Sequence, residues 1–198
     1  MRTGSVVAHV HFGHAERVDA YCAADPGSLT QKGLYGKTAL VIGVERNQSE
    51  VVRILLGRGA GAASWSGAAR SAIESAVEYG SDELVIMLLD EGFATPEQSS
   101  PLGGPLHFAA KDGRLDILKP IIDAGYNVHA KDARGNTALH IASGAGHVDF
   151  AMALVGYGAD PLTWNNAGET ALSLAESKGH KDLYTRLKRV TQTPLTER

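Results

Sequence analysis

The sequence has little cysteine, few aromatic residues and no long apolar run. A single cysteine, Cys22, excludes an intramolecular disulfide framework and is typical of a reducing compartment. No apolar stretch approaches the roughly 18 residues that a membrane-spanning helix needs, and the N-terminus lacks the pattern of a signal peptide. The formal net charge of -3 disfavours non-specific nucleic-acid binding, which needs a basic surface. We therefore expect a cytoplasmic protein with no membrane or nucleic-acid partner.

Catalytic signatures are also missing. The sequence contains no Gly-x-Ser-x-Gly elbow, no phosphate-binding P-loop and no His-Glu-x-x-His zinc motif. Gly144-Ala145-Gly146 begins like a dinucleotide fingerprint, but the third glycine is absent and a helical pattern precedes it. These observations predict a protein that is not an enzyme and that uses no cofactor.

An internal repeat dominates what is present. The phrase GNTALHIASGAGH at residues 135–147 returns as GETALSLAESKGH at 168–180, 33 residues later. The same step links Thr38, Ser71, Gly104, Thr137 and Thr170, and nine positions further on Asn47, Gly80, Gly113, Gly146 and Gly179. A fixed period of this length is typical of stacked repeat architectures.

Each repeat reads as two short helices and a loop. Threonine or serine caps the first helix, and glycine or asparagine ends it in a left-handed turn. A second apolar pattern, such as that around Leu88 or Leu154, predicts a second helix, and the polar stretch 127–137 predicts a hairpin. Because no repeat can bury its apolar face alone, the repeats are expected to stack. Pro120 falls inside a second helix, where we expect a kink or local widening.

The pattern resembles the ankyrin repeat family. The family phrase T-P-L-H-x-A is closest at residues 105–109 and 137–142, and Gly-His follows at 146–147 and 179–180. The resemblance implies an all-α repeat solenoid of about six stacked helix-turn-helix units with connecting β-hairpin loops and terminal units that act as caps. The expected domain covers residues 1–190, with a flexible tail at 191–198. Its units are expected at 1–32, 33–65, 66–98, 99–131, 132–164 and 165–190.

Seven of the eight histidines fall into two groups. His107, His140, His147 and His180 stand at repeated positions, which predicts that their ring nitrogens bond backbone groups of adjacent repeats. His9, His11 and His14 are crowded and do not recur. They allow a metal-dependent activity as an alternative, although the cluster lacks a fourth ligand, so we predict no metal site.

Function is expected where the repeats differ. The resemblance implies that a partner protein contacts the hairpin tips and the outward side of the first helices, which together form a concave face. Large aromatic or charged residues at such positions are the residue types of interface hot spots. The predicted partner-binding residues are Leu34, Tyr35, Trp65, Arg70, Glu78, Tyr79, Lys111, Asp112, Lys131, Arg134 and Trp164. The tryptophans could instead pack along their own hairpins. A shallow pocket beside Lys111, Arg134 and Trp164 is also expected.

The sequence thus predicts a monomeric protein-protein interaction module that acts as an adaptor, scaffold or competitive inhibitor. A regulatory or substrate-recruiting subunit of an enzyme assembly is the alternative. The identity of the partner protein has no signature in the sequence.

Overall fold

The computed structural model describes residues 6–33, 36–60, 72–79, 81–93 and 103–192. By internal packing the chain divides into two compact units, Met1–Ala94 and Thr95–Arg198, which we call the N-terminal and the C-terminal unit. The described residues form twelve α-helices and short 3-10 turns, with no β-strand. The all-helical class predicted from the sequence is therefore confirmed for this part of the chain.

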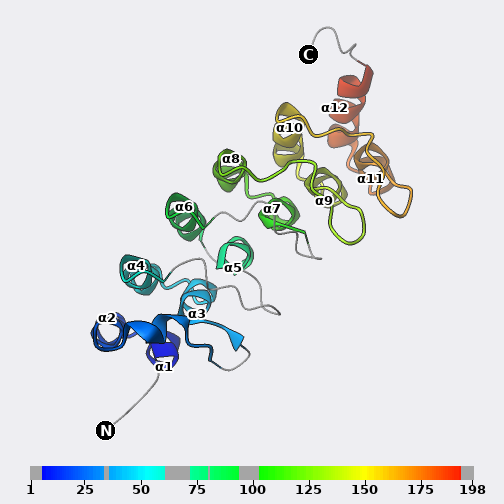
Figure 1. Ribbon diagram of the computed structural model, residues 1–198. Helices are drawn as coiled ribbons and strands as arrows, with labels where there is room; N and C mark the ends of the chain where they lie inside the picture. The colour runs from blue at the N-terminus through cyan, green and yellow to red at the C-terminus, as the bar shows by residue number, and fades with distance from the viewer. Residues whose placement is uncertain (1–5, 34–35, 61–71, 80, 94–102, 193–198) are drawn as a thin grey trace. The chain divides into compact units, whose positions relative to one another are not determined.

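The N-terminal unit contains three helix pairs. Their bounds are α1 Val6–His11 and α2 Ala15–Ala24, α3 Ala39–Glu45 and α4 Ser49–Gly57, and α5 Ala72–Tyr79 and α6 Asp82–Asp90. A 3-10 turn, η1, covers Pro26–Thr30. The first helices α1, α3 and α5 pack side by side, and α2, α4 and α6 form a second row (Figure 1).

The C-terminal unit also contains three helix pairs. Their bounds are α7 Pro105–Asp112 and α8 Leu118–Asp123, α9 Ala138–Ala145 and α10 Val148–Gly156, and α11 Ala171–Ser177 and α12 Lys181–Gln192. Helix α9 packs between α7 and α11, while α12 packs on both α10 and α11. Helix α12 ends at Gln192 and so includes the first two residues of the predicted tail at 191–198.

The first helices begin where the repeat predicted. Thr38 precedes α3, and its hydroxyl accepts a hydrogen bond from the Val41 amide at 3.5 Å. Thr170 precedes α11 and accepts from the Ser173 amide at 3.1 Å. These bonds satisfy amide groups that the helix itself leaves without an acceptor. Ser71 lies outside the described residues.

The first helices also end at the predicted left-handed residues. Asn47, which follows α3, has a φ of 53° and is the only described non-glycine residue with positive φ. Gly113 and Gly146 end α7 and α9 with φ of 67° and 80°. The counterpart at Gly80 lies outside the described residues.

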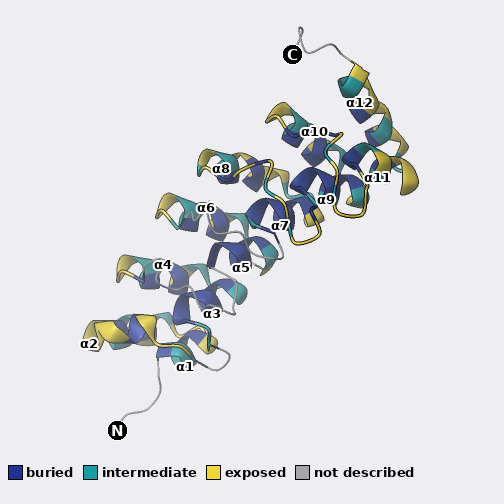
Figure 2. Ribbon diagram, turned by 45° about the vertical axis from the view of Figure 1, so that its right-hand side comes forward, coloured by how far each residue is buried: buried dark blue, intermediate teal, exposed yellow. Residues whose placement is uncertain are grey.

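The core lies between the two rows of helices in each unit. Figure 2 shows the buried faces of the helices turned toward one another. Leu88, Leu139 and Leu154 are fully buried, as the apolar pattern predicted. In the last pair, Leu187 is buried and the neighbouring Lys188 is exposed, which is the polar outer face expected of a terminal repeat.

Pro120 produces a tightening rather than the expected kink or widening. The segment before it, η4, is a 3-10 turn at Leu115–Ile117, and α8 starts only at Leu118. Pro120 therefore occupies the first turn of α8. An amide N–H has no intrahelical partner there, so its absence costs nothing.

Two buried histidines join neighbouring repeats. The ring Nδ1 of His107 accepts from the Gly104 amide at 3.2 Å, and Nε2 bonds the carbonyl of Asn136 at 2.9 Å. His140 repeats this arrangement with the Thr137 amide at 3.1 Å and the Glu169 carbonyl at 3.3 Å. Because Nδ1 accepts a hydrogen bond in both rings, Nε2 must carry the proton. The structural role predicted for these residues is confirmed.

The other repeated histidines cover glycines at helix ends. Nε2 of His147 bonds the Lys111 carbonyl at 3.0 Å, and its ring lies against Gly113. A Cβ at Gly113 would stand 2.6 Å from Nδ1 of that ring. His180 makes the equivalent bond to the Gly144 carbonyl at 3.1 Å. Glycine is thus required both by the backbone and by the neighbouring ring.

Candidate functional site

The hairpins of the C-terminal unit are fixed by one side chain each. Oδ1 of Asp132 accepts hydrogen bonds from the amides of Arg134 at 2.9 Å and Asn136 at 2.8 Å. Asn165, one period later, makes the same pair of bonds in the next hairpin. These bonds mimic a backbone turn and hold the loop in one conformation. The predicted binding residues Lys131, Arg134 and Trp164 therefore lie on ordered loops.

The two hairpins are also bonded to each other. Nζ of Lys131 donates to the carbonyl oxygen of Trp164 at 2.9 Å. The Asn166 amide donates to the carbonyl of Arg134 at 3.0 Å. These contacts bring Lys131, Arg134 and Trp164 together, and we call these three residues the hairpin patch.

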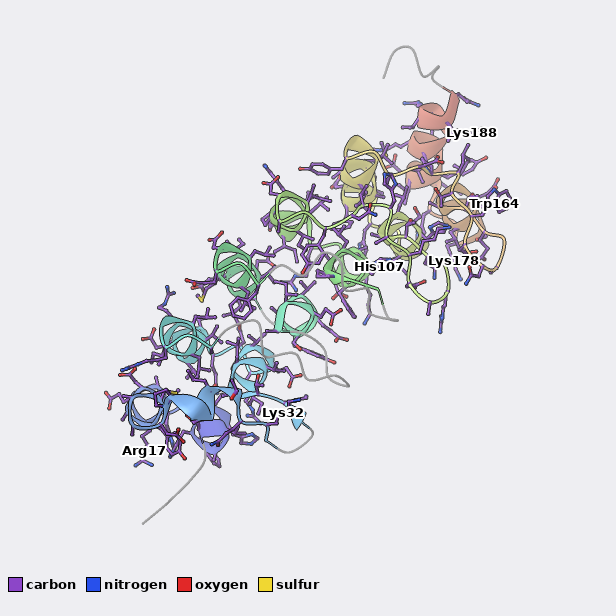
Figure 3. The ribbon with its side chains drawn as sticks, in the orientation of Figure 1. Arg17, Lys32, His107, Trp164, Lys178 and Lys188 are labelled. Atoms are coloured by element: carbon purple, nitrogen blue, oxygen red, sulfur yellow. The ribbon has the colours of Figure 1, made fainter. Side chains whose placement is uncertain are left out.

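The side chain of Trp164 faces solvent. The residue is 64% exposed, and Leu162 on the same hairpin is 47% exposed. Figure 3 shows Trp164 beside α11. This exposure favours the predicted binding role of Trp164 over the alternative in which it packs along its own hairpin. Water contact of a large indole is unfavourable, and an exposed apolar group on an ordered loop is a frequent feature of binding surfaces.

Lys111 and Asp112 form the last two residues of α7, and both are exposed. The hydrogen bond from His147 to the carbonyl of Lys111, described above, restrains the backbone from which the Lys111 side chain extends. At the equivalent place in the next repeat stand Gly144 and the exposed Ala145. The shallow pocket expected above these small residues stays a prediction.

The N-terminal unit carries a second part of the predicted site. Glu78 and Tyr79 end α5, and Tyr79 is 55% exposed. The predicted binding residues that lie outside the described residues are Leu34, Tyr35, Trp65 and Arg70.

Phe12 is an exposed aromatic that the sequence reasoning missed. It follows α1 and is 70% exposed, the largest value among the exposed large apolar residues described. The rings of His11 and His14 lie 5.3 Å and 6.0 Å from its ring, centroid to centroid. Glu45, Glu78 and Lys111 recur every 33 residues at the ends of the first helices, and Phe12 stands one period before Glu45. Extending this series toward the N-terminus would have found it.

The histidines at residues 9, 11 and 14 do not converge on a common point. Nε2 of His11 lies 3.0 Å from the Arg46 guanidinium, which can only donate. The ring of His9 faces Tyr21 instead, at 6.0 Å between centroids. Among the residues described, no three His, Cys, Asp or Glu side chains are placed to hold a metal ion.

Paired antiparallel helices, left-handed glycines at the helix ends and bonded hairpins define a protein built from helix-pair repeats. The comparison with known families bears on the repeats of the C-terminal unit. Residues 106–192 match the family model described as ankyrin repeats (3 copies), and this part of the chain is an ankyrin-repeat segment. The match covers the three helix pairs of the C-terminal unit from Leu106 onward.

The other findings add no relative and no membrane-spanning helix within the described residues. No curated protein matches the chain. Within the described residues, none of the helices is long and apolar enough to cross a membrane. Ankyrin repeats are in general protein-protein interaction modules and are typically not enzymes.

Proposed function

We propose that this protein is a monomeric interaction module that binds one partner protein and acts as an adaptor, scaffold or competitive inhibitor. The partner is gripped by hairpin residues and by the ends of the first helices. The 33-residue period runs without insertion through five units, from Thr38 to Thr170. This continuity supports a single domain of six stacked repeats over residues 1–190.

The exposure of Trp164 is the observation that carries the proposal. Its main chain is bonded to Lys131, so the indole is presented with little conformational freedom to lose on binding. The exposed cations Lys131 and Arg134 flank it on bonded hairpins. An aromatic anchor with a charged rim is the usual organisation of an interface hot spot.

The proposal is tested by comparing three immobilised proteins, the parent, Trp164→Ala and Tyr157→Ala, in extracts of the native source. Tyr157 is 40% exposed and follows α10, so its removal is a matched loss of an exposed aromatic outside the hairpin patch. We expect a protein retained by the parent and by Tyr157→Ala to bind Trp164→Ala about thirtyfold more weakly, as for a hot-spot residue.

Quantitative mass spectrometry of the retained proteins gives the readout, after each variant is shown to melt like the parent. If every protein retained by the parent is retained equally by Trp164→Ala, the hairpin patch is not the binding site. A retained enzyme whose activity changes on binding would instead favour the regulatory-subunit alternative.

A further inference from the structure

The last helix pair concentrates positive charge. Residues 178–192 contain five cations, namely Lys178, Lys181, Arg186, Lys188 and Arg189, and one carboxylate, Asp182. The segment therefore has a net charge of +4, and since the whole chain carries -3, the rest carries -7. Solvated surfaces normally intersperse both signs, so this separation is unusual for a face that only confers solubility.

The single carboxylate is already used. Asp182 pairs with Arg186 on the next turn at 3.1 Å. Lys178, Lys181 and Lys188 are all exposed and have no carboxylate partner among the described residues. We call these three lysines the basic stripe.

Helix geometry places two members of the basic stripe on one side of α12. Lys181 and Lys188 are seven residues apart, which is two turns and about 10 Å along the axis. Lys178 lies outside α12: it directly follows the last residue of α11, three residues before Lys181 (Figure 3). Tyr184 lies between Lys181 and Lys188 in the sequence of α12, and the Lys188 ammonium is 5.4 Å from the centroid of its ring. Both buried residues of α12, Leu183 and Leu187, lie on the opposite side.

Folding does not require this arrangement. A cation near a helix C-terminus is favourable, which accounts for Lys178 directly after α11 and for Arg189 in the last turn of α12, but not for Lys188. Lys181 is the first residue of α12, where a positive charge opposes the helix dipole. The basic stripe thus includes a residue that weakens the helix carrying it.

We propose that the basic stripe binds an acidic segment of a protein partner. The complementary charge explains the clustered lysines and the unfavourable position of Lys181. The exposed residues of α12 are all polar, and Tyr184 and Val190 are only partly exposed, so the helix lacks the continuous apolar face that inserts into a lipid surface. A nucleic acid is long enough to run beyond the basic stripe onto the rest of the chain, whose net charge of -7 would repel it, whereas a short acidic segment contacts the basic stripe alone.

This surface is distinct from the hairpin patch, and the proposal does not depend on it. A short acidic segment needs only two helical turns of contact. The attraction is electrostatic between exposed charges, so it must weaken as salt shortens the screening length to about 8 Å at physiological ionic strength.

The test uses fluorescein-labelled hexaglutamate and, as a neutral control, hexaglutamine, with binding followed by fluorescence anisotropy at low ionic strength. The variant is Lys181→Glu/Lys188→Glu. The matched control is Arg17→Glu/Lys32→Glu, which makes the same change of charge at two exposed cations of the N-terminal unit. We expect the α12 variant to bind hexaglutamate about tenfold or more weakly than the parent, and the control variant to bind within about twofold.

A second measurement locates the contact. In the parent, amide chemical shifts should change on adding hexaglutamate at residues 178–192 and not in the hairpin at 127–137. If the α12 variant does not fold, Lys181→Gln/Lys188→Gln takes its place with the same expectation of weaker binding. Equal affinity of parent and α12 variant would overturn the proposal. So would binding of single-stranded DNA or phosphatidylserine vesicles in preference to hexaglutamate, or shifts confined to the hairpin.

Discussion

At the scale of single residues, the buried histidines make the stability of the C-terminal unit depend on pH. Burial lowers the pKa of His107 and of His140 below the ordinary value of 6.5, because the interior disfavours the charged imidazolium. Protonation at Nδ1 would also turn an accepted hydrogen bond into a repulsion between two N–H groups.

Acid should therefore destabilise the fold. Below about pH 6.5 the histidines of the unfolded chain bind protons that those of the folded chain do not. The free energy of unfolding therefore decreases as the pH is lowered below this value. Each histidine can contribute up to about 1.4 kcal/mol per pH unit. Urea denaturation of the parent from about pH 7.5 to about pH 5.5 should show this slope.

The double variant His107→Gln/His140→Gln should flatten the slope. His129→Gln, at an exposed histidine of the same unit, should leave it unchanged. A parental slope in the double variant would show that other groups cause the pH dependence.

The sequence predicted the role of these histidines because they recur, but it could not predict the exposure of Trp164. A repeated residue has a repeated environment, whereas Trp164 stands at a position that varies between repeats. Its side chain is directed by the bonds between two hairpins, and those bonds link residues one period apart. Phe12 was missed for a different reason: the first repeat differs so much from the others that the place of Phe12 in the 33-residue period is not evident.

At the scale of helices, the helix ends were predictable and the shape of α8 was not. Left-handed glycines leave a local signature, because few other residues adopt positive φ. The effect of Pro120 depended on where α8 begins, and helix boundaries are poorly defined by sequence patterns. Because a 3-10 turn occupies Leu115–Ile117, α8 begins only at Leu118, and Pro120 lies in its first turn, where proline is tolerated.

Substitution of two helix-ending glycines distinguishes the cost of backbone strain from the cost of lost packing. Gly146 and Gly179 have nearly the same φ, 80° and 78°. A Cβ at Gly146 would stand 2.5 Å from Nδ1 of His180, whereas at Gly179 nothing lies within 4 Å. Gly146→Ala should therefore destabilise the protein by about 1 kcal/mol or more beyond the loss in Gly179→Ala.

Urea denaturation of the two variants measures the difference. The shared loss reports the positive φ, and the excess reports displacement of the His180 ring from the Gly144 carbonyl. Equal losses would mean that the ring moves aside freely and that the repeated Gly-His pair has no packing role.

At the scale of the whole molecule, the period of 33 residues carried the prediction of the fold class. The family match at residues 106–192 and the helix pairs of both units agree with it. The binding surface was less predictable, because residues that define the repeat are buried or bond the backbone, and those that recognise a partner are free to differ. The three residues of the hairpin patch are among those predicted from the sequence, whereas the three lysines of the basic stripe are distinguished by their exposure and by the ion pair that Asp182 already makes.

Photo-crosslinking tests the central claim, that a protein partner docks on the hairpin patch, most directly. A benzoyl-phenylalanine is placed at position 162 in one protein, which keeps Trp164 intact, and at position 157 in another, and each is irradiated in an extract of the native source. We expect a discrete adduct with one partner protein from position 162 and none from position 157, since only the former lies on the hairpin that carries Trp164. Absence of an adduct from position 162, or the same adduct from both positions, would contradict the account.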